Sequence, residues 1–149
     1  MNAPANKRAS RPSYAPPSKS GVVPRPRELA VLLVDPDRAA RTQLAHLLTD
    51  RYAVYEAEDG LVALRLASMI PNLAVVVSEM ELPTLHGLDL AKVFKSHALL
   101  TNIPFVFLST GASANDVHRF LAAGASRYLY KSLKPRTVAR IVTKLTARD

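Results

Sequence analysis

From residue 28 onward, the chain alternates short apolar runs with longer amphipathic stretches. Five apolar runs have the length of a β-strand, at 29–34, 53–55, 73–77, 105–108 and 128–130. The runs at 29–34, 73–77 and 105–108 are almost continuously apolar, which is typical of strands that are covered on both faces. The pattern therefore predicts five short strands, of which at least three lie between two layers of helices.

Helical periodicity fills the stretches between these runs. Asp37 can cap a first helix, and further helices are predicted over 60–70, 88–97 and 113–123. The second should end before Pro71, and the fourth at Gly124, because both residue types terminate helices. The last helix is predicted to begin near Pro135. Its apolar side recurs at i, i+3, i+4 and i+7, through Val138, Ile141, Val142 and Leu145.

Strict alternation of strands and helices favours parallel strands joined by right-handed crossovers. The sequence thus predicts an α/β fold, a flavodoxin-like doubly wound sheet built from five βα units. The strand order 2-1-3-4-5 is taken from known folds of this class rather than derived. In such sheets, functional groups gather at the carboxyl ends of the strands. Asp35, Glu79, Ser109 and Lys131 each follow an apolar run, so we expect them to converge.

Five segments carry a family resemblance, in order over 28–147: 33–35 with Arg41, 56–64, 79–88, 103–109 and 123–131. Together they resemble the receiver domain of two-component response regulators. The spacings from 79 to 109 and from 109 to 131 are those expected in that family. The resemblance implies a signalling module rather than an enzyme, in a bacterial, cytoplasmic setting. Its implied partners are a histidine kinase or a downstream effector.

The resemblance also implies roles for individual residues. Glu79 stands at the phosphoacceptor position, where the family has Asp, and Asp35 with Asp37 forms the acidic turn that binds Mg²⁺ in the family. Ser109 and Lys131 match the hydroxyl and the lysine that contact the phosphoryl group. Tyr128 matches the switch aromatic, which moves with the hydroxyl residue. That motion reshapes the face formed by the fourth helix, fifth strand and fifth helix, which is also a possible homodimer surface.

Several departures fall on the phosphorylation machinery. Glu79 is one methylene longer than Asp, which displaces its oxygens by about one ångström, and in-line transfer tolerates such misplacement poorly. Pro36 takes the second acidic position of the turn, and Asp37 is favoured as a helix cap. Ser132 replaces a proline that the family holds in a cis bond, so the Lys131–Ser132 bond could be cis or trans. His86 stands where the family often has Asp.

These departures predict a pseudo-receiver, a protein-interaction module that works without phosphorylation. No cofactor and no metal site are expected, and the only Mg²⁺ candidate is the pair Asp35 and Glu79. Two interpretations of Glu79 stay open: it imitates the phosphorylated state, or it forms a simple ion pair with Lys131. The alternatives in function are a phospho-accepting single-domain regulator, which would use Mg²⁺, and a nucleic-acid-binding protein.

Composition adds limits and one further lead. A chain of 149 residues suits one domain, and the absence of Cys excludes disulfides and thiolate chemistry. No apolar run reaches membrane-spanning length, and no secretory signal is recognised, so a cytoplasmic location is expected. The net charge of +8 is concentrated in residues 1–27, which hold six basic residues, no acid and six of the 11 prolines.

Residues 1–27 are predicted to be a disordered basic tail preceding a receiver-like domain at 28–149. The tail is either an arm for nucleic acid or an acidic partner, or an inert linker. A second basic feature lies on the last helix, where cations recur every four residues: Arg136, Arg140, Lys144 and Arg148. This stripe is either a docking face for an acidic partner or nucleic acid, or a solvated surface.

Overall fold

The computed structural model describes residues 28–111 and 113–147, and these form one parallel sheet flanked by helices. The strands are β1 (Ala30–Val34), β2 (Ala53–Ala57), β3 (Leu73–Ser78), β4 (Phe105–Ser109) and β5 (Arg127–Tyr130). The helices are α2 (Arg38–Leu48), α3 (Gly60–Ala67), α4 (Gly87–Ser96), α5 (Ala114–Ala122) and α6 (Pro135–Thr146). The order β2-β1-β3-β4-β5 confirms the predicted flavodoxin-like fold. The predicted tail at 1–27 and Arg148 lie outside the described residues.

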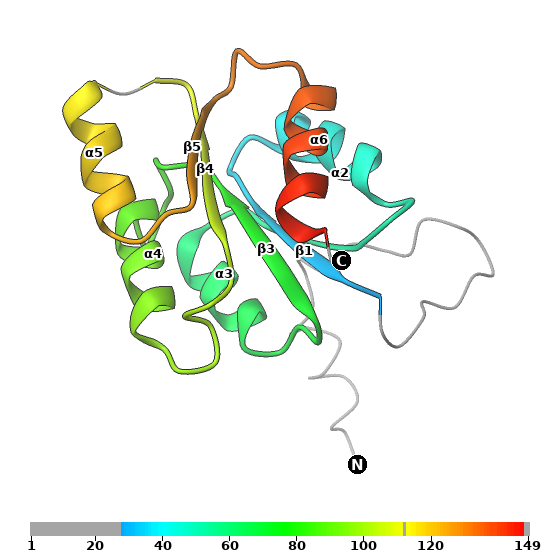
Figure 1. Cartoon of the computed structure of the whole chain (residues 1–149), viewed down its shortest axis with the longest axis horizontal. Helices are drawn as coiled ribbons and strands as arrows, with labels where there is room; N and C mark the ends of the chain where they lie inside the picture. Colours follow the sequence, from blue (N-terminus) through cyan, green and yellow to red (C-terminus); the bar gives the residue numbers. More distant parts are fainter. Residues whose placement is uncertain (1–27, 112, 148–149) are drawn as a thin grey trace.

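Two layers of helices cover the sheet, with α2 and α6 on one face and α3, α4 and α5 on the other (Figure 1). Alternate residues of each strand point to opposite faces. On β1, Leu32 and Val34 pack toward α3–α5, whereas Val31 and Leu33 pack toward α2 and α6. All five residues of β1 are buried, as the continuous apolar run predicted.

The layer containing α4 and α5 has an aromatic core. Phe105 lies between Phe94 and Phe107, with ring centroids 5.3 and 5.2 Å away, and Phe107 lies 4.8 Å from Phe120. Aromatic pairs at these separations stabilise the core by more than the burial of their apolar area alone. The row extends to Tyr128 on β5, so this core reaches the strand that precedes Lys131.

Local signals fix most helix ends. The Asp37 carboxylate accepts from the Ala40 N–H and begins α2, as predicted, and Gly124 follows α5 with a φ of +107°. The predicted helix at 60–70 is wrong at its end, because α3 stops at Ala67. The N–H groups of Met69 and Ile70 both donate to the Leu66 carbonyl, which tightens the last turn before the chain reaches Pro71.

The loop between β3 and α4 crosses closely over the start of α3. The Gly60 N–H donates to the Pro83 carbonyl at 3.2 Å, and the Thr84 hydroxyl donates to the Asp59 carboxylate at 3.1 Å. A Cβ at Gly60 would lie 2.0 Å from the Leu85 backbone oxygen. The crossing therefore requires glycine at position 60 and fixes the loop that follows Glu79.

The Gly60→Ala variant should lower the free energy of unfolding by about 1–3 kcal/mol, because the new methyl group overlaps backbone that cannot rotate away. Urea denaturation followed by circular dichroism would measure the loss. Gly111→Ala is the matched control, since a Cβ there meets nothing within 4 Å. Equal stability of the two variants would contradict this account of the crossing.

Candidate functional site

Four polar residues meet at the carboxyl edge of the sheet, as the sequence predicted. Asp35 follows β1, Glu79 follows β3, Ser109 ends β4 and Lys131 follows β5. Backbone bonds extend the ladder to this edge: the Glu79 N–H donates to the Val34 carbonyl at 2.8 Å, and the Lys131 N–H to the Ser109 carbonyl at 2.7 Å. Parallel pairing thereby brings together residues that are far apart in sequence.

The Glu79 side chain is enclosed by donors and is only 7% exposed. Its Oε1 lies 2.9 Å from the Lys131 ammonium, and its Oε2 accepts from the Ser109 hydroxyl. The same Oε2 accepts from the backbone N–H groups of Met80 at 2.6 Å and Glu81 at 3.3 Å. One carboxylate thus engages a cation, a hydroxyl and two amides.

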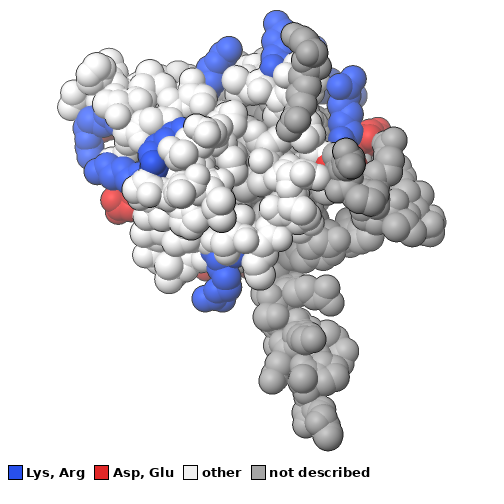
Figure 2. Space-filling view, turned by 60° about the horizontal axis from the view of Figure 1, so that its bottom comes forward, with Lys and Arg blue, Asp and Glu red and all other residues white. Residues whose placement is uncertain are grey.

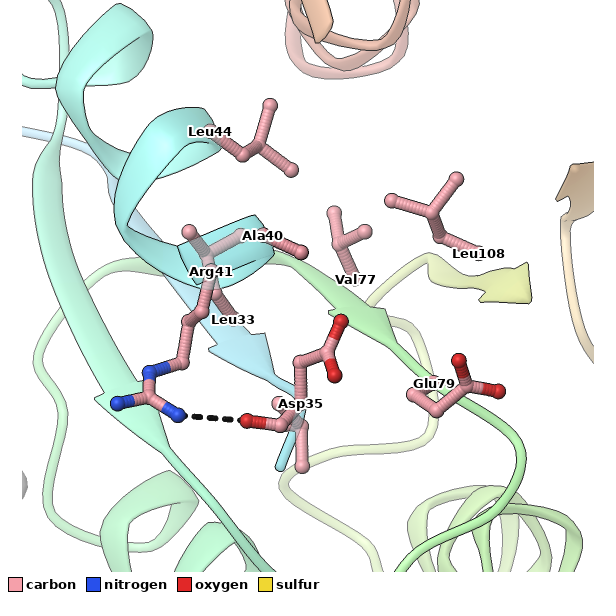
Figure 3. A pocket seen from close by; sticks show the side chains of 9 residues that line it. Leu33, Asp35, Ala40, Arg41, Leu44, Val77, Glu79 and Leu108 are labelled. Atoms are coloured by element: carbon pink, nitrogen blue, oxygen red, sulfur yellow. Dashed lines mark hydrogen bonds between the residues drawn. The ribbon is translucent and has the colours of Figure 1, made fainter. Parts of the chain in front are cut away.

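Asp35 completes the cluster from the neighbouring strand. Its Oδ2 lies 2.8 Å from the Lys131 ammonium, and its Oδ1 accepts from the Asp37 N–H at 2.8 Å. The Asp35 carbonyl accepts from Arg41, whose Nε pairs with Glu56 at 2.7 Å. Figure 3 shows this Arg41 contact, with the Asp35 and Glu79 carboxylates at the ends of neighbouring strands. Lys131 therefore bridges two carboxylates and leaves the three-residue cluster with one net negative charge.

The comparisons with known proteins agree with this architecture. A family model, the response regulator receiver domain, matches residues 31–143. The chain belongs to the receiver domain family. The two-component response regulator ORR3 of Oryza sativa subsp. indica is 33% identical over 124 residues, covering 83% of this chain and 94% of that protein. The two-component response regulator-like APRR5 of Arabidopsis thaliana is 34% identical over 108 residues, covering 71% of this chain and 19% of that protein.

Solved structures show the same relationship. The chemotaxis response regulator CheY4 of Vibrio cholerae superposes with a TM-score of 0.72 at 27% identity, covering 78% of this chain and 98% of that one. The receiver domain of the Francisella response regulator 1452 gives 0.71 at 25% identity, covering 79% and 96%. Plant and bacterial proteins both occur among these relatives, so the bacterial setting stays a prediction. In the described residues, no helix is both long and apolar enough to cross a membrane.

The charge state of the receiver's cluster follows from its contacts. Burial raises the pKa of Glu79, but the hydrogen bonds from Ser109, Lys131 and the Glu81 amide, with the Lys131 charge, outweigh it and lower the pKa overall. Burial likewise lowers the pKa of Lys131, but the bonds and charges of Asp35 and Glu79 outweigh it and raise the pKa overall. Both groups are therefore charged at neutral pH, and the cluster is a true ion network.

The acidic turn supplies one carboxylate, that of Asp35, to the cluster. Pro36 offers no carboxylate, and Asp37 is exposed and caps α2, as the sequence favoured. The two remaining carboxylates, Asp35 and Glu79, already share the Lys131 ammonium. Among the described residues, no group of three or more His, Asp or Glu side chains could hold a metal ion. Mg²⁺ is usually held by one or two carboxylates and several waters, so at this site it would have to displace the Lys131 ammonium from Asp35 and Glu79, and Pro36 offers no further carboxylate.

A small cavity lies beside the two carboxylates, beneath α2 (Figure 3). Its volume is about 20 Å³, which is room for roughly one water molecule. Apolar side chains such as Leu33, Leu44 and Val77 form much of its wall. The cavity is therefore too small for a cofactor.

Tyr128 stacks on Phe120, with ring planes 3° apart and centroids separated by 5.5 Å. Its hydroxyl is buried and, among the described residues, has no hydrogen-bond partner. Burial raises the pKa of Tyr128; Ser109 opposes this shift, although the two hydroxyls do not meet hydrogen-bond geometry. Ser109 donates its proton to Glu79 instead, so the predicted switch aromatic and hydroxyl are not bonded to each other.

The remaining site residues show what sequence reasoning missed. The Met80 and Glu81 amides were not predicted, because a backbone donor carries no signal in residue type. The Lys131–Ser132 bond, left open by the sequence, is trans, since the described residues contain no cis peptide bond. His86 caps α4 by accepting from the Leu88 N–H at 3.3 Å.

Replacing Lys131 by Met should raise the pKa of Glu79, because the lowering bond and charge are lost and the raising effect of burial remains. In the wild type, the folded state lowers the pKa of Glu79 from 4.5, the value in the unfolded chain. The ionised carboxylate therefore stabilises the fold above pH 4.5, and this stability is lost as the pH falls through the folded-state pKa. The variant should therefore lose this contribution at a higher pH than the wild type. NMR titration of the Glu79 carboxyl carbon would measure the pKa. Denaturant unfolding at a series of acidic pH values would measure the loss of stability.

Lys134→Met is the matched control, because Lys134 is exposed at the start of α6, whereas the cation of the cluster is Lys131. It removes the same charge from the same loop. An unchanged pKa of Glu79 in Lys131→Met, or equal pKa changes in both variants, would show that the Lys131 ion pair does not lower this pKa.

Proposed function

We propose that this receiver domain is a pseudo-receiver, a protein-interaction module in a two-component-type pathway that acts without phosphotransfer. One observation carries the proposal: the Glu79 carboxylate engages both Ser109 and Lys131. In receiver domains, the hydroxyl and lysine at those positions contact the phosphoryl group. Here their donors are used by a residue of the chain itself.

The contacts of Glu79 favour mimicry of the phosphorylated state over a simple ion pair. An ion pair requires only Lys131, whereas Glu79 also draws in the Ser109 hydroxyl and the Met80 amide. The longer side chain places its oxygens further from the backbone than Asp would. The imitation is partial, because a carboxylate has one charge and two oxygens, and a phosphoryl group has three oxygens and nearly two charges.

This arrangement gives a biased equilibrium rather than a switch. The Ser109 hydroxyl donates to Glu79 and not to Tyr128, so the α5–β5–α6 face is held in one conformation. The exposed cations of α6, Arg136, Arg140 and Lys144, lie beside that face as a partner surface. The signalling output then depends on which protein binds this face, a kinase or an effector. A second copy of the chain could bind there too and form a homodimer.

A phospho-accepting regulator is the alternative, and a chemical test separates the two. Acetyl phosphate with Mg²⁺ should give no mass gain of one phosphoryl group on the wild type, because the Glu79 oxygens are engaged and the metal ligands are incomplete. Amide NMR with Mg²⁺ and then beryllofluoride should also be flat. A conventional receiver domain is the positive control, and shifts centred on Asp35, Glu79 and Lys131 would overturn the pseudo-receiver proposal.

The Glu79→Asp variant should also remain unlabelled by acetyl phosphate. It restores the family's acceptor but leaves Pro36 in the acidic turn, so the second metal-binding carboxylate is still missing. Intact mass measured over a time course gives the result. Labelling to the level of the positive control would show that Pro36 does not limit the chemistry.

Glu79→Ala should leave the fold intact, since Lys131 keeps Asp35, but it should free Ser109 and change the distant face. Amide shifts are expected to spread from the site to Tyr128 and α6. Glu81→Ala is the control, because its side chain is exposed and adjacent. Shifts confined to the loop in both variants, at matched stability, would support the simple ion pair and end the mimicry hypothesis.

A further inference from the structure

The amino edge of the sheet, opposite the Glu79 cluster, carries the two most exposed large apolar side chains of the described residues. Leu99 is 83% exposed in the loop 97–104 between α4 and β4, and Met69 is 59% exposed in the loop 68–72 between α3 and β3. Both loops lie at the bottom of Figure 1, where the neighbouring helices α3 and α4 end. These two loops form one surface, the amino-edge face.

The amino-edge face is free of formal charge, because neither loop contains Asp, Glu, Lys or Arg. His97 is the one titratable side chain in the two loops, and its Nδ1 accepts from the Leu99 N–H at 3.2 Å, which fixes the backbone that presents Leu99. Figure 2 turns this side of the molecule forward and shows a broad area without charged side chains. Apolar side chains that gather on an exposed, uncharged face indicate a contact site.

The charged residues at the same edge of the sheet are mostly basic. Glu28 and Asp50 are acids at this edge, and in α5 the charges of Arg119 and Asp116 cancel, since their side chains pair at 3.5 Å. Cations come from the last turns of three helices, the turn before β2 and the start of β5: Arg65, Lys95, Lys144, Arg51 and Arg127. The balance at this edge therefore favours an anionic partner.

The basic segment 1–27 joins the domain beside the amino-edge face. It is followed by Glu28, and β1 begins at Ala30, so the segment is attached at the amino end of β1. The Ala30 N–H donates to the Asn72 carbonyl at 2.9 Å, which ties this point of attachment to the loop that carries Met69. With six basic residues and no acid, the segment brings positive charge to the same edge.

We propose that the amino-edge face docks on the surface of an anionic lipid bilayer. Leu99 and Met69 would enter the boundary between headgroups and acyl chains, and the cations of segment 1–27 would meet the lipid phosphates. A small apolar anchor and a polybasic segment reinforce each other at such a surface, because each alone binds weakly. The inference does not rest on the proposed function, since the Glu79 cluster lies at the opposite edge of the sheet.

Other occupants use only one of the two features. A second copy of the chain could cover Leu99 and Met69, but it would bring two segments of six basic residues together. A nucleic acid matches the positive charge, but it leaves both apolar side chains without an apolar partner, since its outer surface is phosphate. A folded acidic protein would need a separate hollow for each protruding side chain, whereas a bilayer yields around them.

The first test is flotation of the full chain with vesicles of phosphatidylcholine, either alone or with about one third phosphatidylglycerol. The chain should float with the anionic vesicles and stay at the bottom of the gradient with the neutral ones. Added salt should reduce the bound fraction, because it screens the attraction between cations and lipid phosphates.

A fluorescent label tests the insertion of the loop. The chain contains no Cys, so Leu99→Cys accepts a single nitrobenzoxadiazole group. Its emission should rise and shift to the blue when anionic vesicles are added, because the label leaves water. Thr110→Cys is the matched control, since Thr110 is exposed directly after β4, at the carboxyl edge, and its label should not respond.

Paired variants assign binding to the apolar side chains. Met69→Ser with Leu99→Ser should weaken vesicle binding about tenfold or more, because the apolar anchor is lost. Leu61→Ser with Leu133→Ser removes two other exposed leucines, at the starts of α3 and α6 near the carboxyl edge, and should have little effect. All four side chains are exposed, and matched thermal unfolding would show that the variants keep the fold.

A second pair of variants assigns the charge. Arg8→Gln with Arg11→Gln should weaken binding to anionic vesicles about tenfold, because two cations of segment 1–27 are lost. Arg38→Gln with Arg136→Gln lowers the net charge equally at exposed positions at the starts of α2 and α6, and should have a much smaller effect.

Four results would each overturn the proposal: no binding to anionic vesicles, equal binding to neutral ones, a silent label at position 99, or equal weakening by the paired variants. A DNA duplex that binds more tightly than the vesicles, and is unaffected by Leu99→Ser, would assign the charge to nucleic acid. Dimers that Met69→Ser with Leu99→Ser dissociates would assign the face to a second copy. Phosphodonor labelling of a chain that still binds vesicles would end the pseudo-receiver proposal alone.

Discussion

Two carboxylates are buried side by side at the carboxyl edge of this sheet, and the Lys131 ammonium between them makes that burial possible. Asp35 and Glu79 lie 2.8 and 2.9 Å from its nitrogen. Removing water from an ionised carboxylate is costly unless a cation and hydrogen-bond donors replace it. Ser109 and the amides of Met80, Glu81 and Asp37 supply those donors. The loops at this edge are consequently arranged around one lysine.

The rest of the fold holds these loops in place. Asp35, Glu79 and Ser109 sit at or directly after strands that are buried between two helical layers, so they cannot move far without disturbing the core. Lys131 follows the edge strand β5, which is anchored in the core by Leu129. The loop after Glu79 is also fixed from outside, where it crosses Gly60 and bonds to Asp59. A well-packed scaffold of this kind keeps a short ion network in one geometry.

The closed site has a consequence for signalling. In a receiver that responds to phosphate, the hydroxyl and the lysine at the edge of the sheet contact the phosphoryl group. In this chain, the Glu79 carboxylate already engages the Ser109 hydroxyl and the Lys131 ammonium. Under the proposed function, recognition falls to the surface, above all to the α5–β5–α6 face. Regulation would then come from the presence or concentration of a partner rather than from a chemical mark.

The sequence by itself determined the architecture. Continuous apolar runs such as 73–77 and the cap at Asp37 predicted buried parallel strands and helix starts, because these depend on local periodicity and hydrogen bonding. It also brought Asp35, Glu79, Ser109 and Lys131 to one edge, since parallel strands end together. The end of α3 was placed three residues too late, because the last turn tightens before Pro71 through bonds that periodicity does not show.

Only the tertiary structure decided how the site is used. Lys131 bridges both carboxylates, and two backbone amides complete the shell around Glu79. Ser109 donates to Glu79, so within the described part of the chain the Tyr128 hydroxyl has no partner. These choices depend on distances across strands. A groove between α2 and the start of α6 likewise joins residues about ninety positions apart in the chain, such as His46 and Arg136. Residue types and spacing restrict which groups can meet, but side-chain packing sets which partner each charged group takes, because every buried charge must find its donors in three dimensions.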